Sequence, residues 1–278
     1  MVIQTWKEVK QMSKLNCTVF DKKTQKNKSV GFMEIKNSTD EKAELFIYGD
    51  IVSDQWSKWE DEDTCPQDIT NFLKEIDKYE DVDIYINSGG GSVFAGIAIY
   101  NQLKRHSGNK TVHIDGIAAS IASVIACAGD KVIIPKASQF MIHKPSCSYF
   151  WTSMNADELR RDADALDVSQ KSITSIYMEN VKEGVTEEQI SELINAETWF
   201  TGNDVTNYFD FEVEETGEAV ACASNYYERY RNIPQNLLNI SNENEEDKQK
   251  QSDEAEKNNQ IENKMKELEV FMKMQSFI

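Results

Sequence analysis

The first candidate for a catalytic residue is Ser120, which lies in the segment 116–123. A strand is expected over residues 111–115, and the small and apolar residues 121–128 are expected to form a helix. A serine at such a strand-to-helix turn can act as a nucleophile, because small neighbours let a substrate approach and the first free N–H groups of the helix can face negative charge. Taken alone, however, a serine between alanines is more simply interpreted as an N-cap that opens a buried helix.

Two further motifs favour the interpretation of Ser120 as a nucleophile over that of an N-cap. Upstream, a strand expected over 83–87 ends in a glycine turn at 88–91, whose backbone N–H groups can bind an anion. Downstream, His143 stands at the end of an apolar strand over 139–142, just before Lys144 and Pro145. Each motif alone is weak, but the three together, in this order, are specific.

The sequence contains three histidines, so the choice of a general base is short. His106 is expected at an exposed helix end and is a poor candidate. His113 lies in the strand that leads to Ser120 and forms a local pair with Asp115. Residues two apart in a strand project along one face, which places neither of them behind the serine. His113 is therefore predicted to be structural.

Length and composition limit the classes of function. The 278 residues, 40% of them hydrophobic, can bury a substantial core, and one domain with tails is expected. A net charge of −18 argues against nucleic acid and anionic membranes as partners.

Five widely spaced cysteines without a CxxC pair indicate neither disulfides nor zinc, and a reducing cytoplasm fits best. The longest apolar stretch, 117–129, is too short to span a bilayer, and the N-terminus lacks a secretory signal.

Strands and helices alternate along the chain. Strands are expected over 43–50, 83–87, 111–115, 131–134, 139–142 and 211–213, and helices over 66–79, 92–105, 121–128, 155–181 and 186–194. Residues 56–65 are expected to form a loop, and short apolar patches at 17–20 and 31–35 suggest a hairpin. The alternation predicts an α/β architecture with right-handed crossovers.

The glycine turn, the serine after Ala118 and Ala119, and the histidine before Pro145 together resemble the Clp protease proteolytic subunit. The resemblance covers about residues 43–215 and implies a ClpP/crotonase-like spiral of ββα repeats. The helix over 155–181 would then be the handle through which two rings stack. By spacing alone, an ordinary surface helix is an equally good interpretation.

The resemblance implies a role for each site residue. Ser120 would be the nucleophile and His143 the base. The family has an aspartate, then an aromatic residue two positions later and a hydroxyl residue two after that. Glu197, Trp199 and Thr201 occupy those places here. Glutamate is longer than aspartate but can serve as the third triad member, whereas the alternative is a surface carboxylate.

The same resemblance implies an oxyanion hole formed by the backbone N–H groups of Gly91 and Ile121. Ser92 and Val93 would border the peptide-binding cleft. The family has a proline where this chain has Gly89, a change that softens the turn but leaves the donors available.

The chain is divided by composition and resemblance into four parts. Residues 1–41 are a polar N-terminal segment of unknown role, 42–216 the ClpP-like serine peptidase domain, and 217–240 a C-terminal extension. Residues 241–278 begin as a polar acidic linker. They end in a short helix that is either a docking or coiled-coil helix or a weakly ordered tail.

The implied function is a serine endopeptidase without a metal or organic cofactor. It would assemble with itself into rings, either heptamers or stacked heptamers. The segments 47–51, 88–91 and 197–201 and the polar extension favour the bacteriophage branch, which matures proheads by cleaving scaffold and capsid proteins in the host cytoplasm or inside the prohead. The alternatives are a housekeeping subunit that works with a AAA+ unfoldase, a crotonase-fold acyl-CoA hydratase or isomerase, and a non-catalytic scaffold component.

Overall fold

The computed structural model of the chain describes residues 13–21, 26–35, 42–76, 80–149, 151–215, 224 and 229–234. The chain divides into two compact units, residues 1–233 and 234–278. Near the N-terminus, β1 (Ser13–Asp21) and β2 (Lys26–Ile35) pair antiparallel, which confirms the predicted hairpin. The linker and terminal helix predicted over 241–278 lie outside the described residues.

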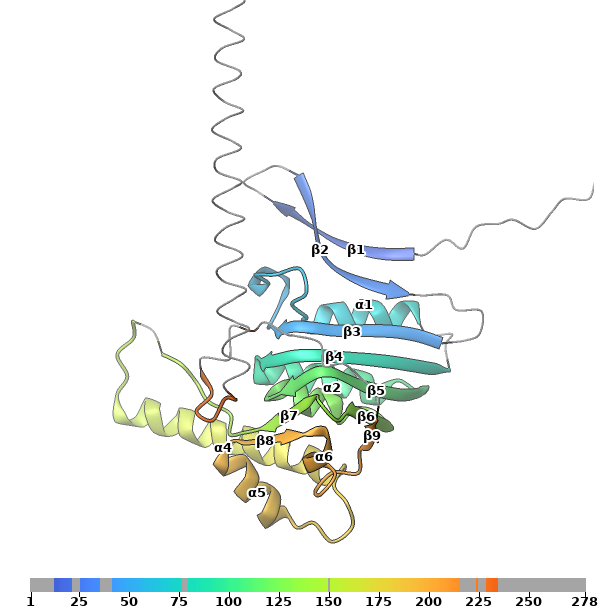
Figure 1. Cartoon of the computed structure of the whole chain (residues 1–278). Coiled ribbons are helices and arrows are strands. Elements are labelled where there is room, and N and C mark those ends of the chain that lie inside the picture. Colours follow the sequence, from blue (N-terminus) through green and yellow to red (C-terminus); the bar gives the residue numbers. More distant parts are fainter. Residues whose placement is uncertain are drawn as a thin grey trace, which may run out of the picture. The chain divides into compact units, whose positions relative to one another are not determined.

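A seven-stranded sheet organises the rest of the first unit (Figure 1). Its strands are β3 (Lys42–Ile51), β4 (Asp81–Gly91), β5 (Asn109–Ala119), β6 (Lys131–Pro135), β7 (Gln139–Ile142), β8 (Thr198–Thr201) and β9 (Glu212–Glu214). The order is β3-β4-β5-β6-β9, with β7 beside β5 and β8 beside β7. All pairs are parallel except β7 with β8. The predicted α/β class is therefore confirmed, although β8 had not been expected.

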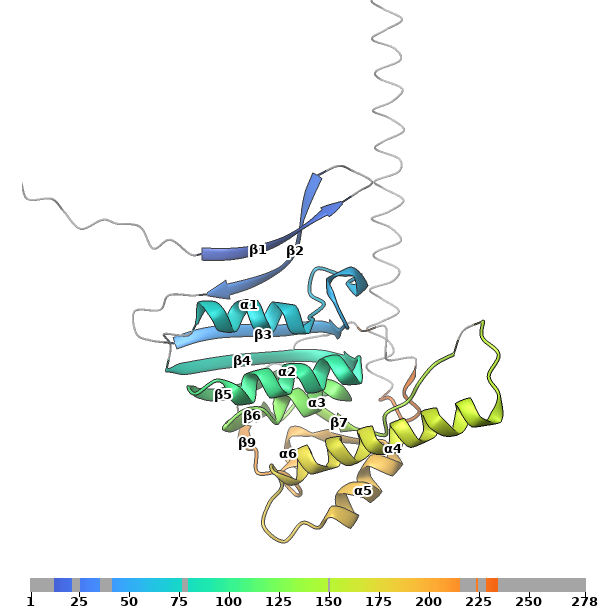
Figure 2. The same cartoon turned by 180° about the vertical axis from the view of Figure 1, so that it is seen from behind.

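Helices connect these strands as the alternation predicts. They are α1 (Pro66–Glu75), α2 (Val93–Arg105), α3 (Ile121–Ala126), α4 (Ala156–Met178), α5 (Glu187–Ala196) and α6 (Gly202–Val205), with a 3-10 turn, η1 (Gln55–Ser57), in the expected loop. Figure 2 shows α1, α2 and α3 covering one face of the sheet. Between these helices and the sheet lies the core, because alternate side chains of the strands point toward the helices. Ile84, Ile86, Val112 and Ile114 are fully buried there.

Three helices end earlier than predicted, and α3 does so at Ala126 rather than residue 128. The first, α1, stops at Glu75 rather than residue 79, because Ile76 already leaves helical geometry and caps the carbonyl of Phe72. The long helix α4 stops at Met178 rather than residue 181. There the side-chain amide of Asn180 donates to the carbonyl of Ile176 at 3.0 Å and closes the last turn. Among the helices that the structure describes, none is both long and apolar enough to cross a bilayer.

The opposite face of the sheet carries a ladder of stacked rings. Phe46 stacks on Tyr85 at 4.9 Å between ring centroids, and Tyr85 stacks on His113 at 4.8 Å. The His113 ring also lies 3.7 Å from the carboxylate of Asp83. These contacts agree with the prediction that His113 is structural. His106 does end α2 as expected, but it is half-buried rather than exposed.

Candidate active site

Strand register brings Ser120 and His143 together. Strand β5 pairs with β7 so that Ala119 lies opposite Met141, and the Ser120 N–H donates to the carbonyl of Met141 at 3.0 Å. His143 follows β7 directly. Its Nε2 lies 2.6 Å from the Oγ of Ser120, across 23 residues of chain. The structure therefore places the predicted nucleophile and the predicted base within hydrogen-bond distance.

The backbone of Ser120 has the strained geometry of a sharp strand-to-helix turn. Its φ of 54° lies in the left-handed region, which costs a non-glycine residue on the order of 1–3 kcal/mol. Although Ser120 precedes α3, its side chain makes no cap hydrogen bond to that helix. The hydroxyl contacts the imidazole instead, so the N-cap interpretation does not describe this serine.

Glu197 lies between the end of α5 and the start of β8. Ile142, the last residue of β7, pairs with Thr198, the first residue of β8, and His143 and Glu197 are the residues next to this pair in the two segments. Glu197 ends α5 in the left-handed conformation, with a φ of 53°, and is only 9% exposed. It is thus not a surface carboxylate.

The carboxylate of Glu197 has a hydrogen-bond partner other than the imidazole. Its Oε1 accepts a hydrogen bond from the backbone N–H of Asn232 at 2.7 Å. Within the part of the chain that the structure describes, no hydrogen bond joins Glu197 to His143. The link between the two groups in the structure is therefore electrostatic, since the charge of Glu197 raises the pKa of His143.

The surroundings of His143 favour its neutral form. Burial is the main cause and lowers the pKa of His143 below its usual range, the nearby charge of Glu197 raises this pKa, and the cationic Arg231 lowers it further. A neutral imidazole whose Nε2 faces a serine hydroxyl can accept the hydroxyl proton. The electrostatics therefore suit a general base at neutral pH.

The glycine turn predicted at 88–91 is not a loop in the structure but the end of strand β4, where Gly90 and Gly91 pair with Asp50 and Ile51 of β3. Gly91 has a φ of +146°, and a Cβ there would lie 2.1 Å from the carbonyl oxygen of Ile51, so only glycine fits. The next residue, Ser92, donates its N–H to the same carbonyl at 2.7 Å. Ile121 follows Ser120 as the first residue of α3. The roles of Gly91 and Ile121 as oxyanion donors stay predictions.

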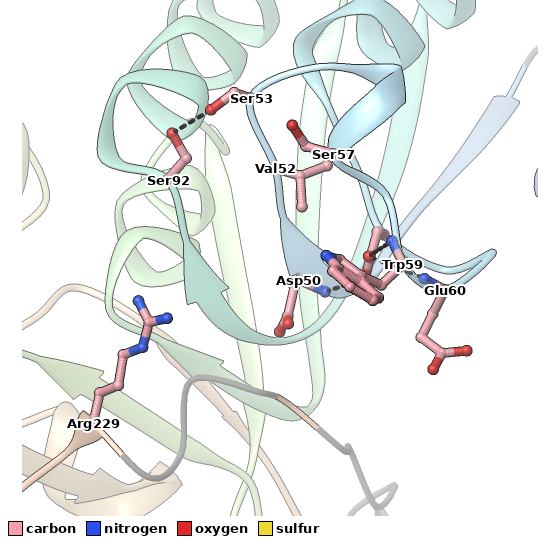
Figure 3. Close-up of a pocket in the computed structure, with 9 residues that line it drawn as sticks. Asp50, Val52, Ser53, Ser57, Trp59, Glu60, Ser92 and Arg229 are labelled. Carbon is pink, nitrogen blue, oxygen red and sulfur yellow. Dashed lines mark hydrogen bonds between the residues drawn. The ribbon is translucent and has the colours of Figure 1, made fainter. Parts of the chain in front are cut away.

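The two predicted cleft residues, Ser92 and Val93, line different cavities. A small cavity of about 10 Å³, room for about one water, is lined by Ser120, His143 and mainly apolar side chains, Val93 among them. Ser92 lines a polar cleft of about 590 Å³ instead. Figure 3 shows this cleft, in which Ser53 bonds to Ser92 and Arg229 extends from the opposite side.

Three residues beyond the predicted domain boundary at 216 also reach the site, and sequence analysis missed them. Tyr230 packs its ring against His143, Asn232 bonds to Glu197, and Arg231 affects the pKa of His143. The one signal in the sequence is a cluster of tyrosines, at 226, 227 and 230, in an otherwise polar extension. Such a cluster does not say which surface it covers.

A mainly parallel α/β sheet, in which a serine that follows β5 is hydrogen-bonded to a histidine that follows the neighbouring β7, has the arrangement used by serine nucleophiles. The chain belongs to the Clp protease family, whose family model matches residues 34–209.

Individual relatives agree with this assignment. The chain is 33% identical over 138 residues to ATP-dependent Clp protease proteolytic subunit 3 of Rhodococcus jostii and 32% identical over 139 residues to subunit 1 of Streptomyces avermitilis. The matched part is 49% of this chain in both cases, and 66% and 61% of the two relatives, less than two thirds of their lengths. Among solved structures, a ClpP1 mutant from Listeria monocytogenes is similar with a TM-score of 0.51 and 25% identity, over 62% of this chain and 91% of that one. The fold that the resemblance implied is thereby confirmed.

Proposed function

We propose that the protein is a serine endopeptidase, with Ser120 as nucleophile and His143 as general base. The observation that carries this proposal is the 2.6 Å contact between Ser120 Oγ and His143 Nε2, made by a serine whose side chain does not cap its own helix. A serine hydroxyl is a poor nucleophile until a base removes its proton. The contact supplies that base.

The reaction would proceed in two steps. Ser120 Oγ attacks the peptide carbonyl while His143 Nε2 takes its proton, and the resulting oxyanion is bound by the N–H groups of Gly91 and Ile121. His143 then returns the proton to the leaving amine, so that the peptide C–N bond breaks and an acyl-enzyme remains. A water, deprotonated by His143, hydrolyses this ester and restores the serine.

Glu197 would stabilise the imidazolium that forms in each step. Its charge raises the pKa of His143, which has the sign needed to favour protonated histidine in the transition state.

Ring assembly and the identity of the substrate belong to the same proposal. The segments 47–51, 88–91 and 197–201 support the phage branch, in which a self-assembled ring, a heptamer or a stacked pair, would cleave scaffold and capsid proteins in the host cytoplasm or the prohead. The names of the relatives, ATP-dependent Clp protease proteolytic subunits, support a second candidate, a subunit that works with a AAA+ unfoldase. Degradation of a folded substrate that requires an unfoldase and ATP would favour the second candidate. Cleavage of a co-expressed scaffold protein without ATP would favour the first.

The catalytic proposal is tested by intact-mass measurement after treatment with diisopropyl fluorophosphate. We expect one adduct on the purified assembled protein and none on Ser120→Ala or His143→Ala. An adduct that persists in Ser120→Ala would assign the reactivity elsewhere. An assembled wild-type protein without any adduct would refute the peptidase and leave the scaffold and acyl-CoA alternatives.

A further inference from the structure

The short segment 229–233 of the C-terminal extension lies beside the candidate active site, near β8 and α4 (orange-red in Figure 1). Tyr230 is 7% exposed, although it follows a polar stretch. The proposed mechanism uses none of the residues of this segment. Their contacts, however, converge on the groups that the mechanism does use.

Tyr230 contacts the histidine and the glycine turn together. Its ring meets the ring of His143 edge-on, with centroids 5.1 Å apart and planes at 81°, and packs against Trp199 at 5.8 Å. Its hydroxyl donates to the carbonyl of Gly89. A side chain on Gly90 would approach this hydroxyl to 3.2 Å. The tyrosine thus spans from the base to the turn that carries the predicted oxyanion donor Gly91.

Asn232 holds the carboxylate from the same side. Its backbone N–H donates to Glu197 Oε1 at 2.7 Å, and its side-chain amide donates to the carbonyls of Ala196 at 2.8 Å and Glu197 at 3.3 Å. Three hydrogen bonds therefore tie Asn232 to the left-handed end of α5. They restrict both the backbone and the carboxylate of Glu197.

The segment does not line the small cavity beside Ser120. Tyr230 and Asn232 reach the base, the turn and the carboxylate without lining the space next to the nucleophile. Arg229 lines the polar cleft, with Ser92. This placement suits a segment that holds the catalytic groups from the side, rather than one that blocks the space next to Ser120.

We propose that Tyr230 and Asn232 are positioning residues, which hold the imidazole, the glycine turn and the Glu197 carboxylate in the arrangement that activates Ser120. This inference rests on the proposed peptidase function. The Tyr230 ring, packed against His143, restricts rotation of the imidazole. The hydrogen bond from the Tyr230 hydroxyl to the carbonyl of Gly89 holds the glycine turn in place. Misplacement of a catalytic group by about 1 Å can cost about a hundredfold in rate.

The experiment measures the second-order rate of Ser120 phosphonylation by diisopropyl fluorophosphate as a function of pH, on the full-length assembled protein. Tyr230→Leu removes the ring and the hydroxyl, Tyr230→Phe removes the hydroxyl alone, and Asn232→Ala removes the side-chain bonds to the two carbonyls. Tyr208→Leu is the matched control, because Tyr208 is half-buried and packs against Phe200 at 5.7 Å without contacting His143.

We expect Tyr230→Leu to slow labelling at least about tenfold. The labelling rate of Tyr230→Phe should lie between those of Tyr230→Leu and the wild type, and the rate of Tyr208→Leu should equal that of the wild type. The pH dependence of the labelling rate is a second readout, which a loss of stability alone would not change. Water admitted beside His143 relieves its burial, so the acid limb of the profile shifts to higher pH in Tyr230→Leu. Glu197 and Arg231, the charged groups that act on His143, are unchanged.

Labelling of Tyr230→Leu and Asn232→Ala at the wild-type rate would overturn the inference while leaving the peptidase intact. Faster labelling of either variant would also overturn it, because the segment would then be a cover rather than a support. A wild-type protein that is not labelled at all would refute the proposed function itself. If Tyr230→Leu does not fold, Asn232→Ala decides, with at least about threefold slower labelling expected.

Discussion

Glu197 raises the pKa of His143 by its charge, yet the hydrogen bond that its Oε1 accepts comes from the backbone N–H of Asn232, 2.7 Å away. This carboxylate is thus held by the C-terminal extension rather than by the imidazole. In a Ser-His-Asp site the carboxylate bonds to the imidazole and sets its tautomer. The difference leads to a specific expectation for Glu197.

Glu197→Gln is expected to lower the pKa of His143, because a charge that raises this pKa is removed. The acid limb of the kcat/KM profile on a peptide substrate should therefore move to lower pH. The loss of rate should stay well below the roughly ten-thousandfold known for an aspartate that is bonded to its histidine. A ten-thousandfold loss would mean that Glu197 bonds to the imidazole in the reacting enzyme.

Arg231→Gln is expected to have the opposite effect on pH dependence. Arg231 lowers the pKa of His143, so its removal should raise this pKa and move the acid limb to higher pH. Arg161→Gln provides the control, since it makes the same change of net charge at an exposed position on α4. If both variants shift the limb equally, the effect comes from net charge rather than from Arg231.

Gly91→Ala should be much more destabilising than Gly184→Ala. Both glycines have positive φ, and an alanine at either position bears backbone strain on the order of 1–3 kcal/mol. Only at Gly91 would the new Cβ also meet a backbone carbonyl, that of Ile51, at 2.1 Å, whereas nothing lies within 4 Å of the position at Gly184. Urea unfolding should show an extra loss of at least about 2 kcal/mol for Gly91→Ala. Equal losses would show that the turn can shift to make room.

The buried hydroxyl pair of Ser123 and Tyr177, 2.7 Å apart, joins α3 to α4. Ser123→Ala should cost about 1–3 kcal/mol of unfolding free energy, because it leaves the fully buried Tyr177 hydroxyl without a partner. Tyr177→Phe should cost only about 1 kcal/mol, since Ser123 keeps its bond to the Ser120 carbonyl. The double variant should lose less than the sum of the two single losses, because it leaves no Tyr177 hydroxyl unpaired and adds to Tyr177→Phe only the loss of the Ser123 bond to the Ser120 carbonyl. Additive losses in this cycle would show that the two hydroxyls do not interact.

Sequence and structure contributed different parts of the site. Ser120, His143 and the glycine turn were predicted because each sits where a strand ends, and the ends of parallel strands gather at one edge of a sheet. Glu197 was predicted only by resemblance. Strand β8, which begins directly after Glu197, was missed, because four residues are too few for a period-2 pattern to be recognised.

By itself, the sequence determined the α/β alternation and the residue types at the turn, the nucleophile and the base, since hydrophobic periodicity and turn chemistry are local properties of a chain. The tertiary structure alone decided the 2.6 Å contact of Ser120 with His143 and the packing of Tyr230 beside them. The bond from Tyr230 to Gly89 joins residues 141 positions apart. No local pattern encodes such a contact, because it depends on how the whole sheet places the two segments side by side.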